Sequence, residues 1–161
     1  MKIEARIGRT DLFRFMFYHM YMRPTGLIYL VVGLAALGAG IWFLTTGNSG
    51  GVFLIVISGV YFVLQPAFLY VKAGQQASDE NIRRTTVYSF DSEGIHAEQE
   101  GQESTLFWEK VYKAVYFAGE LIIYQTDVRA NIVPLPRESA DTAEVLEIIR
   151  ENLPKKKIRG F

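Results

Sequence analysis

The amino-acid sequence predicts a membrane α-helical hairpin of two transmembrane helices, joined to a cytoplasmic α+β domain. An uncharged stretch at residues 24–71 predicts the hairpin, because all 17 basic and all 17 acidic residues lie outside it. Short alternating apolar segments after residue 84, parted by turn residues, predict an antiparallel meander or small barrel. One amphipathic segment near the C-terminus predicts a helix that closes the strands.

The uncharged stretch contains two apolar runs, residues 26–46 and 51–71, which the turn residues 47–50 separate. A helix needs about 20 residues to cross a hydrocarbon core of ~30 Å, so each run is long enough to span it. A four-residue connection makes the two helices antiparallel neighbours. A signal peptide is a poorer interpretation, because its apolar part is only about 7–15 residues long and begins close to the N-terminus.

Basic residues near the ends of the runs predict the orientation. Because positively charged flanks stay in the cytoplasm, we expect both termini on the cytoplasmic side of the cell membrane and only the turn outside. The turn carries no basic residue. The flanking segments carry Lys2, Arg6, Arg9, Arg14, Arg23, Lys72, Arg83 and Arg84.

Residues with small or polar side chains recur every seven positions in both runs, which favours close packing of two helices in lipid. We expect the two stripes to face each other, and the alternative is the seam of a homo-oligomer. A kink is expected at Gln65 and Pro66, because proline interrupts the helical hydrogen bonds. The stripes consist of Gly26, Gly33 and Gly40 in the first run and Gly51, Ser58 and Gln65 in the second.

The leader, residues 1–25, contains a strand pattern at 2–8 and a helix at 11–22. Ile3 and Ile7 share one face of the strand and need cover, so we expect this strand to join the C-terminal sheet. Thr10 or Asp11 is a suitable helix cap. The helix is aromatic on nearly all sides, which favours a position in the membrane interface.

A polar neck, residues 72–84, precedes the strand-rich domain at 85–154. Asp141 and Glu144 have the spacing of a capping box for the closing helix, and Pro154 ends that helix. The leader strand would be the seventh strand of the domain. The other six are expected at 85–90, 94–99, 104–108, 111–117, 121–125 and 131–135.

A basic tail, residues 155–161, follows the closing helix. Basic residues next to an anionic bilayer contribute about 1 kcal/mol each, so the tail is a candidate contact with the membrane surface. A solvated, disordered end is the alternative. The residues expected at the membrane surface are Arg14, Arg23, Lys72, Lys155, Lys156, Lys157 and Arg159.

The sequence carries no recognisable catalytic motif and no cysteine, so thiolate chemistry is excluded. His19 lies in the aromatic helix, where a packed ring is expected. His96, Glu98 and Glu100 alternate along one strand face, a pattern that fits a solvated surface better than a metal site. We therefore expect no enzyme, no cofactor, no metal and no nucleic-acid partner.

The order of several short motifs resembles the YcxB-like family of bacterial membrane proteins. The resemblance implies a C-terminal domain similar to pleckstrin-homology folds, and it carries over no activity and no binding residues. The motifs are Thr-Asp-Leu-Phe-Arg-Phe at 10–15, Tyr-Ser-Phe-Asp-Ser-Glu-Gly-Ile at 88–95, Trp-Glu-Lys-Val-Tyr-Lys at 108–113, Leu-Ile-Ile-Tyr at 121–124 and Ile-Val-Pro at 132–134.

Two functional hypotheses remain. A pleckstrin-like fold suggests phosphoinositide binding, but the hairpin loops at 91–94 and 100–103 are acidic and would repel phosphate. We favour a non-catalytic membrane-anchored scaffold whose cytoplasmic domain binds a protein partner. The alternative is a lipid-sensing or membrane-organising protein that uses the interfacial helix and the basic tail.

Overall fold

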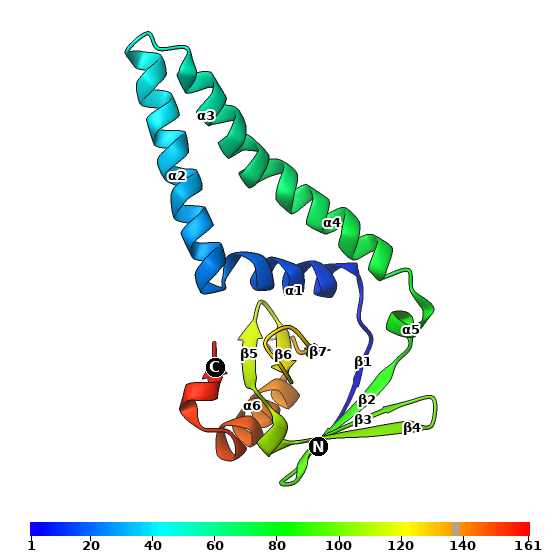
Figure 1. Cartoon of the computed structure of the whole chain (residues 1–161). Coiled ribbons are helices and arrows are strands. Elements are labelled where there is room, and N and C mark those ends of the chain that lie inside the picture. The colour runs from blue at the N-terminus through cyan, green and yellow to red at the C-terminus, as the bar shows by residue number, and fades with distance from the viewer. Residues whose placement is uncertain (137–138) are drawn as a thin grey trace. The chain divides into compact units, whose positions relative to one another are not determined.

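The computed structural model describes residues 1–136 and 139–161, and the chain forms two compact units (Figure 1). One unit consists of Met16–Gln75 and contains two long apolar helices. The other combines Met1–Phe15 with Gln76–Phe161 and is an α+β domain. The domain is therefore discontinuous in sequence, because the apolar helices interrupt it.

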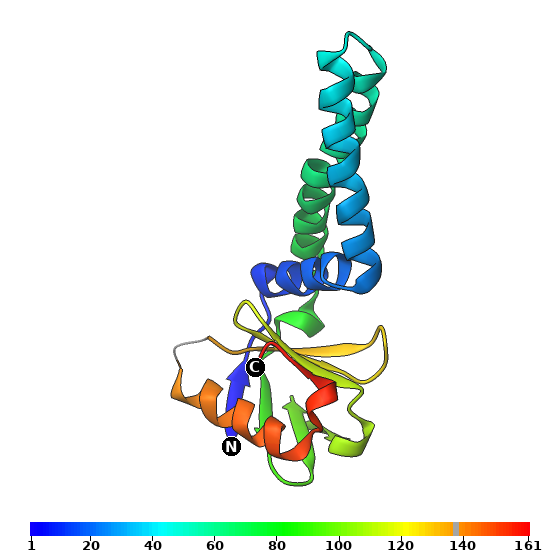
Figure 2. The same cartoon turned by 90° about the vertical axis from the view of Figure 1, so that its left-hand side faces the viewer.

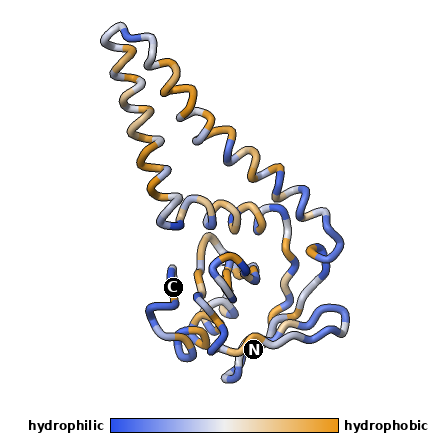
Figure 3. Tube along the Cα trace, viewed as in Figure 1, coloured by the Kyte–Doolittle hydropathy of each residue, from blue (hydrophilic) through white to orange (hydrophobic). Residues whose placement is uncertain are grey.

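The apolar unit contains helix α2, Pro24–Thr45, and a second helix made of α3, Gly50–Gly59, a π-helical turn, Val60–Leu64, and α4, Gln65–Gln76. Both helices are long and apolar enough to cross a membrane, with mean hydropathies of 2.3 and 2.2 (Figure 3). The second helix runs five residues beyond the predicted end at residue 71. No helix-breaking proline lies between residues 71 and 76, so the start of the predicted neck continues the helix.

The small-residue stripes of the two helices face each other, as predicted. A Cβ atom on Gly40 would lie 2.9 Å from the carbonyl oxygen of Gly51, so only glycine permits this approach. At the next pair of stripe residues, the hydroxyl of Ser58 donates to the carbonyl oxygen of Gly33 at 3.2 Å. Ser58 is completely buried. The stripes are thus used within the hairpin itself.

The third pair of stripe residues, Gly26 and Gln65, does not take part in the contact between the two long helices. Gly26 lies directly against the backbone of Met20 and Tyr21 at the end of helix α1, Arg9–Tyr21. The amide of Gln65 donates to the sulfur of Met20 at 2.8 Å. Both residues therefore pack on the end of α1.

The predicted kink at Gln65 and Pro66 takes the form of the π-helical turn. The N–H of Gln65 bonds to the carbonyl of Val60, five residues back, which frees the carbonyl of Tyr61. Pro66 has no N–H that could replace the lost donor. The hydroxyl of Tyr21 on α1 donates to the carbonyl oxygen of Tyr61 instead, at 3.3 Å. It supplies the hydrogen bond that the helix itself cannot make.

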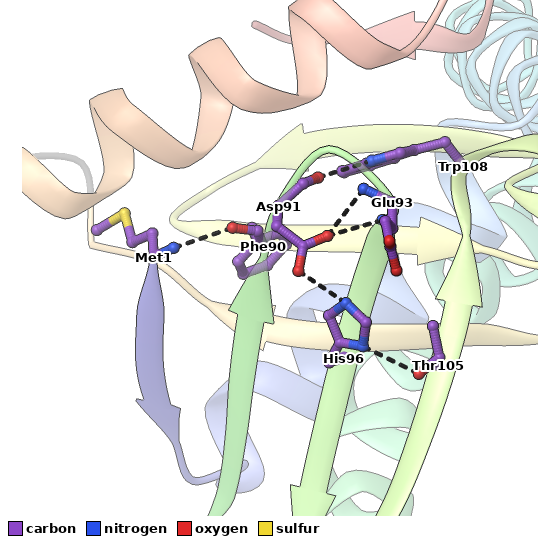
Figure 4. Close-up of polar contacts among 8 residues, drawn as sticks. Met1, Phe90, Asp91, Glu93, His96, Thr105 and Trp108 are labelled. Atoms are coloured by element: carbon purple, nitrogen blue, oxygen red, sulfur yellow. Dashed lines mark hydrogen bonds and ion pairs between the residues drawn. The ribbon is translucent and has the colours of Figure 1, made fainter.

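The first sheet of the α+β domain has the strand order β1-β2-β3-β4, all antiparallel. The leader strand pairs with β2, which confirms that the leader joins the C-terminal domain. The backbone N–H of Phe90 donates to the carbonyl oxygen of Met1, and the amine of Met1 donates back to that of Phe90, both at 2.9 Å (Figure 4). The strands are β1, Lys2–Ala5, β2, Thr86–Phe90, β3, Gly94–Gln99, and β4, Gln102–Phe107, and the short helix α5, Glu80–Arg83, precedes β2.

The leader strand is shorter than predicted, because Gly8 already caps helix α1. The side chain of Asp11 accepts the N–H of Gly8 at 2.7 Å, which is one half of a capping box. The helix therefore begins at Arg9, two residues before its predicted start.

A second sheet has the order β7-β6-β5-β8, so the strands expected as an antiparallel meander or small barrel are divided between two sheets. The chain leaves the first sheet through a 3-10 turn, Trp108–Lys110. There the indole N–H of Trp108 donates to the carbonyl oxygen of Asp91 at 2.9 Å, which holds the turn in place (Figure 4). The strands are β5, Lys113–Phe117, β6, Glu120–Tyr124, β7, Ala130–Pro134, and β8, Ile158–Arg159.

The hydrophobic core lies between the two sheets and helix α6, Ala140–Asn152 (Figure 2). Val145, Ile149 and Leu153 form the buried face of this helix, as the sequence pattern predicts. The predicted capping box at Asp141 and Glu144 is wrong, because the helix begins two residues earlier, with Ser139 as its N-cap.

The outer face of the second sheet is covered by residues 9–15 of helix α1, which belong to the same unit. Leu12 is buried, and the ring of Phe15 lies 6.5 Å from that of Tyr124 on β6. The side chains of β6 are consequently buried on both faces of the sheet.

The predicted basic tail is an ordered part of the domain. Residues 155–157 form a 3-10 turn, and β8 pairs in parallel with β5. Gly160, with φ of +79°, passes so close to the carbonyl of Tyr116 that a Cβ atom would clash. Phe161 packs on the core, with its ring centroid 6.4 Å from that of Tyr116. The alternative of a disordered end is therefore wrong.

Removing residues 158–161 should lower the melting temperature of the α+β domain. The truncation exposes an edge of β5 and removes the partly buried Ile158 and Phe161, which costs about 2 kcal/mol or more. Thermal unfolding of the full chain in detergent, compared with that of the truncated chain, measures the loss. The exposed Arg159→Ala variant is the control. An unchanged melting temperature after truncation would contradict the packing of residues 158–161 on the domain.

Replacing Gly40 by alanine should destabilise the apolar unit, whereas Gly38→Ala should not. The new methyl group at residue 40 would press on the backbone of Gly51, and such overpacking costs about 1–3 kcal/mol. Nothing lies within 4 Å of a Cβ atom at residue 38, so the matched control keeps the change in helix propensity without the clash. Denaturant unfolding in detergent compares the two variants, and equal stabilities would disprove the close contact.

Candidate functional site

One face of the first sheet is open to solvent and carries polar side chains in two rows across the strands. The register aligns Lys2, Ser89, His96 and Thr105 in one row. It aligns Glu4, Val87, Glu98 and Glu103 in the next row. A shallow concavity of about 350 Å³ lies on this face, and its lining includes members of both rows.

His96 is held between two polar partners on the open face (Figure 4). Its Nε2 lies 2.9 Å from Oδ2 of Asp91, and its Nδ1 lies 2.9 Å from the hydroxyl of Thr105. The pKa of Asp91 is lowered, chiefly because its carboxylate accepts the backbone N–H of Glu93, and further by the N–H of Gly94 and by His96. Asp91 is thus a fixed negative charge at the end of the first row.

The structure does not bring His96, Glu98 and Glu100 together as a metal-binding group. His96 faces Asp91 and Thr105, whereas Glu100 forms an ion pair with Arg84. Across residues 1–136 and 139–161, no three side chains of the metal-binding types converge.

A second site lies at Glu120, the first residue of β6. Its side chain is completely buried, and its Oε1 accepts a hydrogen bond from Nη1 of Arg14 at 3.0 Å. A cavity of about 560 Å³ adjoins it, lined by Glu120 together with Asp11, Arg14, Ala118, Gly119, Pro134 and Pro136.

The pKa of Glu120 is raised from 4.5 to about 8. Burial is the main cause, because it penalises the charged carboxylate, and the neighbouring Asp11 raises the pKa further. Arg14 opposes these effects without outweighing them. Glu120 therefore holds a proton at neutral pH, and the group can take up or release it near pH 8.

Sequence reasoning missed Glu120. It follows Ala118 and Gly119 in a pattern that predicts a turn, where acidic residues are ordinarily solvated. Its burial comes from helix α1, and Arg14 is 106 residues away in the sequence. No local signal indicates that contact.

The seven basic residues expected at the membrane surface have different environments. Arg14 bonds to Glu120, and Nη1 of Arg23 lies 3.0 Å from Nε2 of His19. Lys157 donates to the carbonyl oxygen of Val111 at 2.6 Å, so its ammonium group is engaged within the domain. The exposed members are Lys72 on α4 and Lys155, Lys156 and Arg159 at the C-terminus.

Replacing Glu120 by glutamine should flatten the pH dependence of the free energy of unfolding. The folded chain keeps the proton up to about pH 8, whereas the unfolded chain releases it near pH 4.5. Between these values the folded state binds more protons, so the stability of the native chain should fall as the pH rises.

Denaturant unfolding of the full chain in detergent, repeated between about pH 4.5 and 8, measures this slope. The exposed Glu144→Gln variant, which should keep the native slope, is the control. A native chain whose stability does not fall across this window would contradict the raised pKa of Glu120.

The comparison with protein families gives a match to part of this chain. Residues 90–151 match the family model described as YcxB-like protein, from the last residue of β2 to near the end of α6. No curated protein and no solved structure matches the chain. The resemblance is thus confirmed for this part of the chain, and residues 90–151 are similar to the YcxB-like family.

Proposed function

We propose that this chain is a non-catalytic membrane-anchored scaffold whose cytoplasmic α+β domain binds a protein partner. The observation that carries the proposal is the open edge of β4, whose residues are largely exposed although the other elements of the domain pack into a core. Exposed strand edges are frequent binding sites for extended protein segments.

Insertion in a membrane is supported by the surface of the two long helices. Large apolar side chains along them are half exposed or more, among them Ile28, Val31, Phe53, Val63 and Phe68. An apolar surface of this extent is unfavourable in water and favourable in lipid. The basic residues that flank the helices support a cytoplasmic position of both termini in the cell membrane.

The proposal also includes a pleckstrin-homology-like architecture for the α+β domain. Two largely antiparallel sheets with a C-terminal helix packed on their core support this assignment. It adds no ligand, because the loop at 91–94 is acidic and its Asp91 is engaged by backbone N–H groups and His96.

Lipid sensing is the second candidate function, and the exposure of Lys155, Lys156 and Arg159 favours it. These cations belong to a segment that packs on the domain. A folded surface would therefore hold them against the membrane. The engagement of Lys157 with Val111 leaves three cations of the predicted tail for such a contact. We rank this function second for that reason.

The absence of cysteine makes the topology directly testable with single introduced cysteines. On intact cells, a membrane-impermeant maleimide should label Asn48→Cys in the turn between the helices. It should label Ser92→Cys in the β2–β3 loop only after the membrane is permeabilised. Labelling of Ser92→Cys on intact cells, or of neither variant before permeabilisation, would overturn the proposed orientation.

A further inference from the structure

Strand β4 forms the free edge of the first sheet. It pairs with β3 through all six of its residues, and none of the other described strands pairs with its second side. Five of the six residues are exposed, and only Leu106 is half-buried. The backbone groups on this side are therefore accessible to an added strand.

Hairpin geometry indicates which backbone groups point outward. Glu100 and Gly101, both with positive φ, form a two-residue loop between β3 and β4. Such a loop is flanked by a hydrogen-bonded pair, here Gln99 with Gln102, and hydrogen-bonded pairs then alternate along the ladder. The N–H and C=O groups of Glu103, Thr105 and Phe107 consequently point away from β3.

The edge lacks lysine, proline and a very short strand, which are three of the features that ordinarily prevent strand addition. The other described edges have them: β1 carries Lys2, β7 ends in Pro134, and β8 has two residues. β4 has six residues without lysine, arginine or proline. This contrast singles out β4 as an edge that is left available.

The charges beside the edge define what it would accept. Glu98 and Glu103 lie directly opposite each other across β3 and β4. Like charges in such a pair are destabilising, and neither residue has an ion-pair partner among the described residues. Glu4 lies in the same row, so negative charge accumulates on this face.

We propose that β4 accepts an extended, basic segment of a partner protein as an added antiparallel strand. This inference rests on the scaffold function proposed above and specifies its partner. The residue opposite Glu103 would be arginine or lysine, which neutralises the Glu98–Glu103 pair. Residues opposite Thr105 and the exposed Phe107 face the same side and would be β-branched or apolar.

A second copy of this chain is a less suitable occupant of the edge. Antiparallel pairing of β4 with itself has to oppose outward-pointing residues, and pairing centred on Thr105 places Glu103 opposite Phe107, which leaves the Glu98–Glu103 pair without a cation.

Titration of a synthetic peptide onto the full chain in nanodiscs of zwitterionic lipid tests the proposal. The probe is Val-Thr-Val-Thr-Arg-Thr-Arg, and the matched peptide carries glutamate in place of both arginines. We expect the arginine peptide to bind at least tenfold more tightly, with an affinity that falls as salt rises. Equal binding of the two peptides, or binding of neither up to millimolar concentration, would overturn the proposal.

Two sets of variants separate backbone pairing from charge. Thr105→Pro removes one outward N–H without removing a bond to β3, so it should weaken the arginine peptide at least tenfold. Thr105→Val keeps that N–H and should bind within about twofold of the native chain. Glu103→Gln should reduce the preference for the arginine peptide over the glutamate peptide. This variant tests the proposal if circular dichroism shows that Thr105→Pro is unfolded.

The same variants also test whether the chain forms a dimer through β4. A concentration-dependent dimer that Thr105→Pro abolishes would make the second copy the occupant and overturn the proposal. The peptide measurement does not depend on which side of a membrane the domain faces. It can therefore succeed or fail independently of the cysteine-labelling test of the scaffold.

Discussion

The burial of β6 on both faces is the constraint on which the α+β domain depends. Leu121 and Ile123 point into the core, while Ile122 and Tyr124 lie buried on the opposite face. A strand in this position needs cover on both sides, and the C-terminal helix lies on the core side only. The first half of α1 supplies the second cover, so the leader is a structural part of the domain. The buried carboxyl of Glu120 follows from the same arrangement.

The first sheet contrasts with the second, because only one of its faces is covered. Tyr88, Phe90 and Ile95 pack into the core, whereas the opposite face carries the two polar rows. One sheet thus provides stability through burial, and the other keeps an open face and an open edge. This division of roles is what a domain needs if it is to bind another chain without losing its own core.

The sequence pattern was sufficient for elements whose signals are local. The length and hydropathy of two apolar runs predict both long helices, and the seven-residue spacing of Gly33 and Gly40 and of Gly51 and Ser58 predicts their contact. Alternation in the leader, with Ile3 facing inward, predicted a strand that joins the C-terminal sheet. Period and turn residues also located the six strands of the domain to within a few residues.

Contacts between distant segments could not be predicted in this way. Nothing around Glu120 indicates that a helix more than 100 residues earlier covers it. The charge of the tail predicts a membrane contact or a disordered end, but its order comes from Ile158, Gly160 and Phe161, which pack on β5. The division of the strands into two sheets follows the turn at Trp108, whose indole N–H bonds to the distant carbonyl oxygen of Asp91. In each case tertiary packing outweighed the local pattern.

The discontinuity of the domain has a consequence for the order of folding. The leader strand is made first, but its partner β2 lies more than 80 residues later in the chain. At about 5–20 residues per second, synthesis of the intervening chain takes on the order of 4–20 s. Both long apolar helices emerge during this interval, before the leader has a sheet to join. The leader must therefore remain unpaired until β2 has been made, so β1 can close onto β2 only after the two apolar helices have been synthesised.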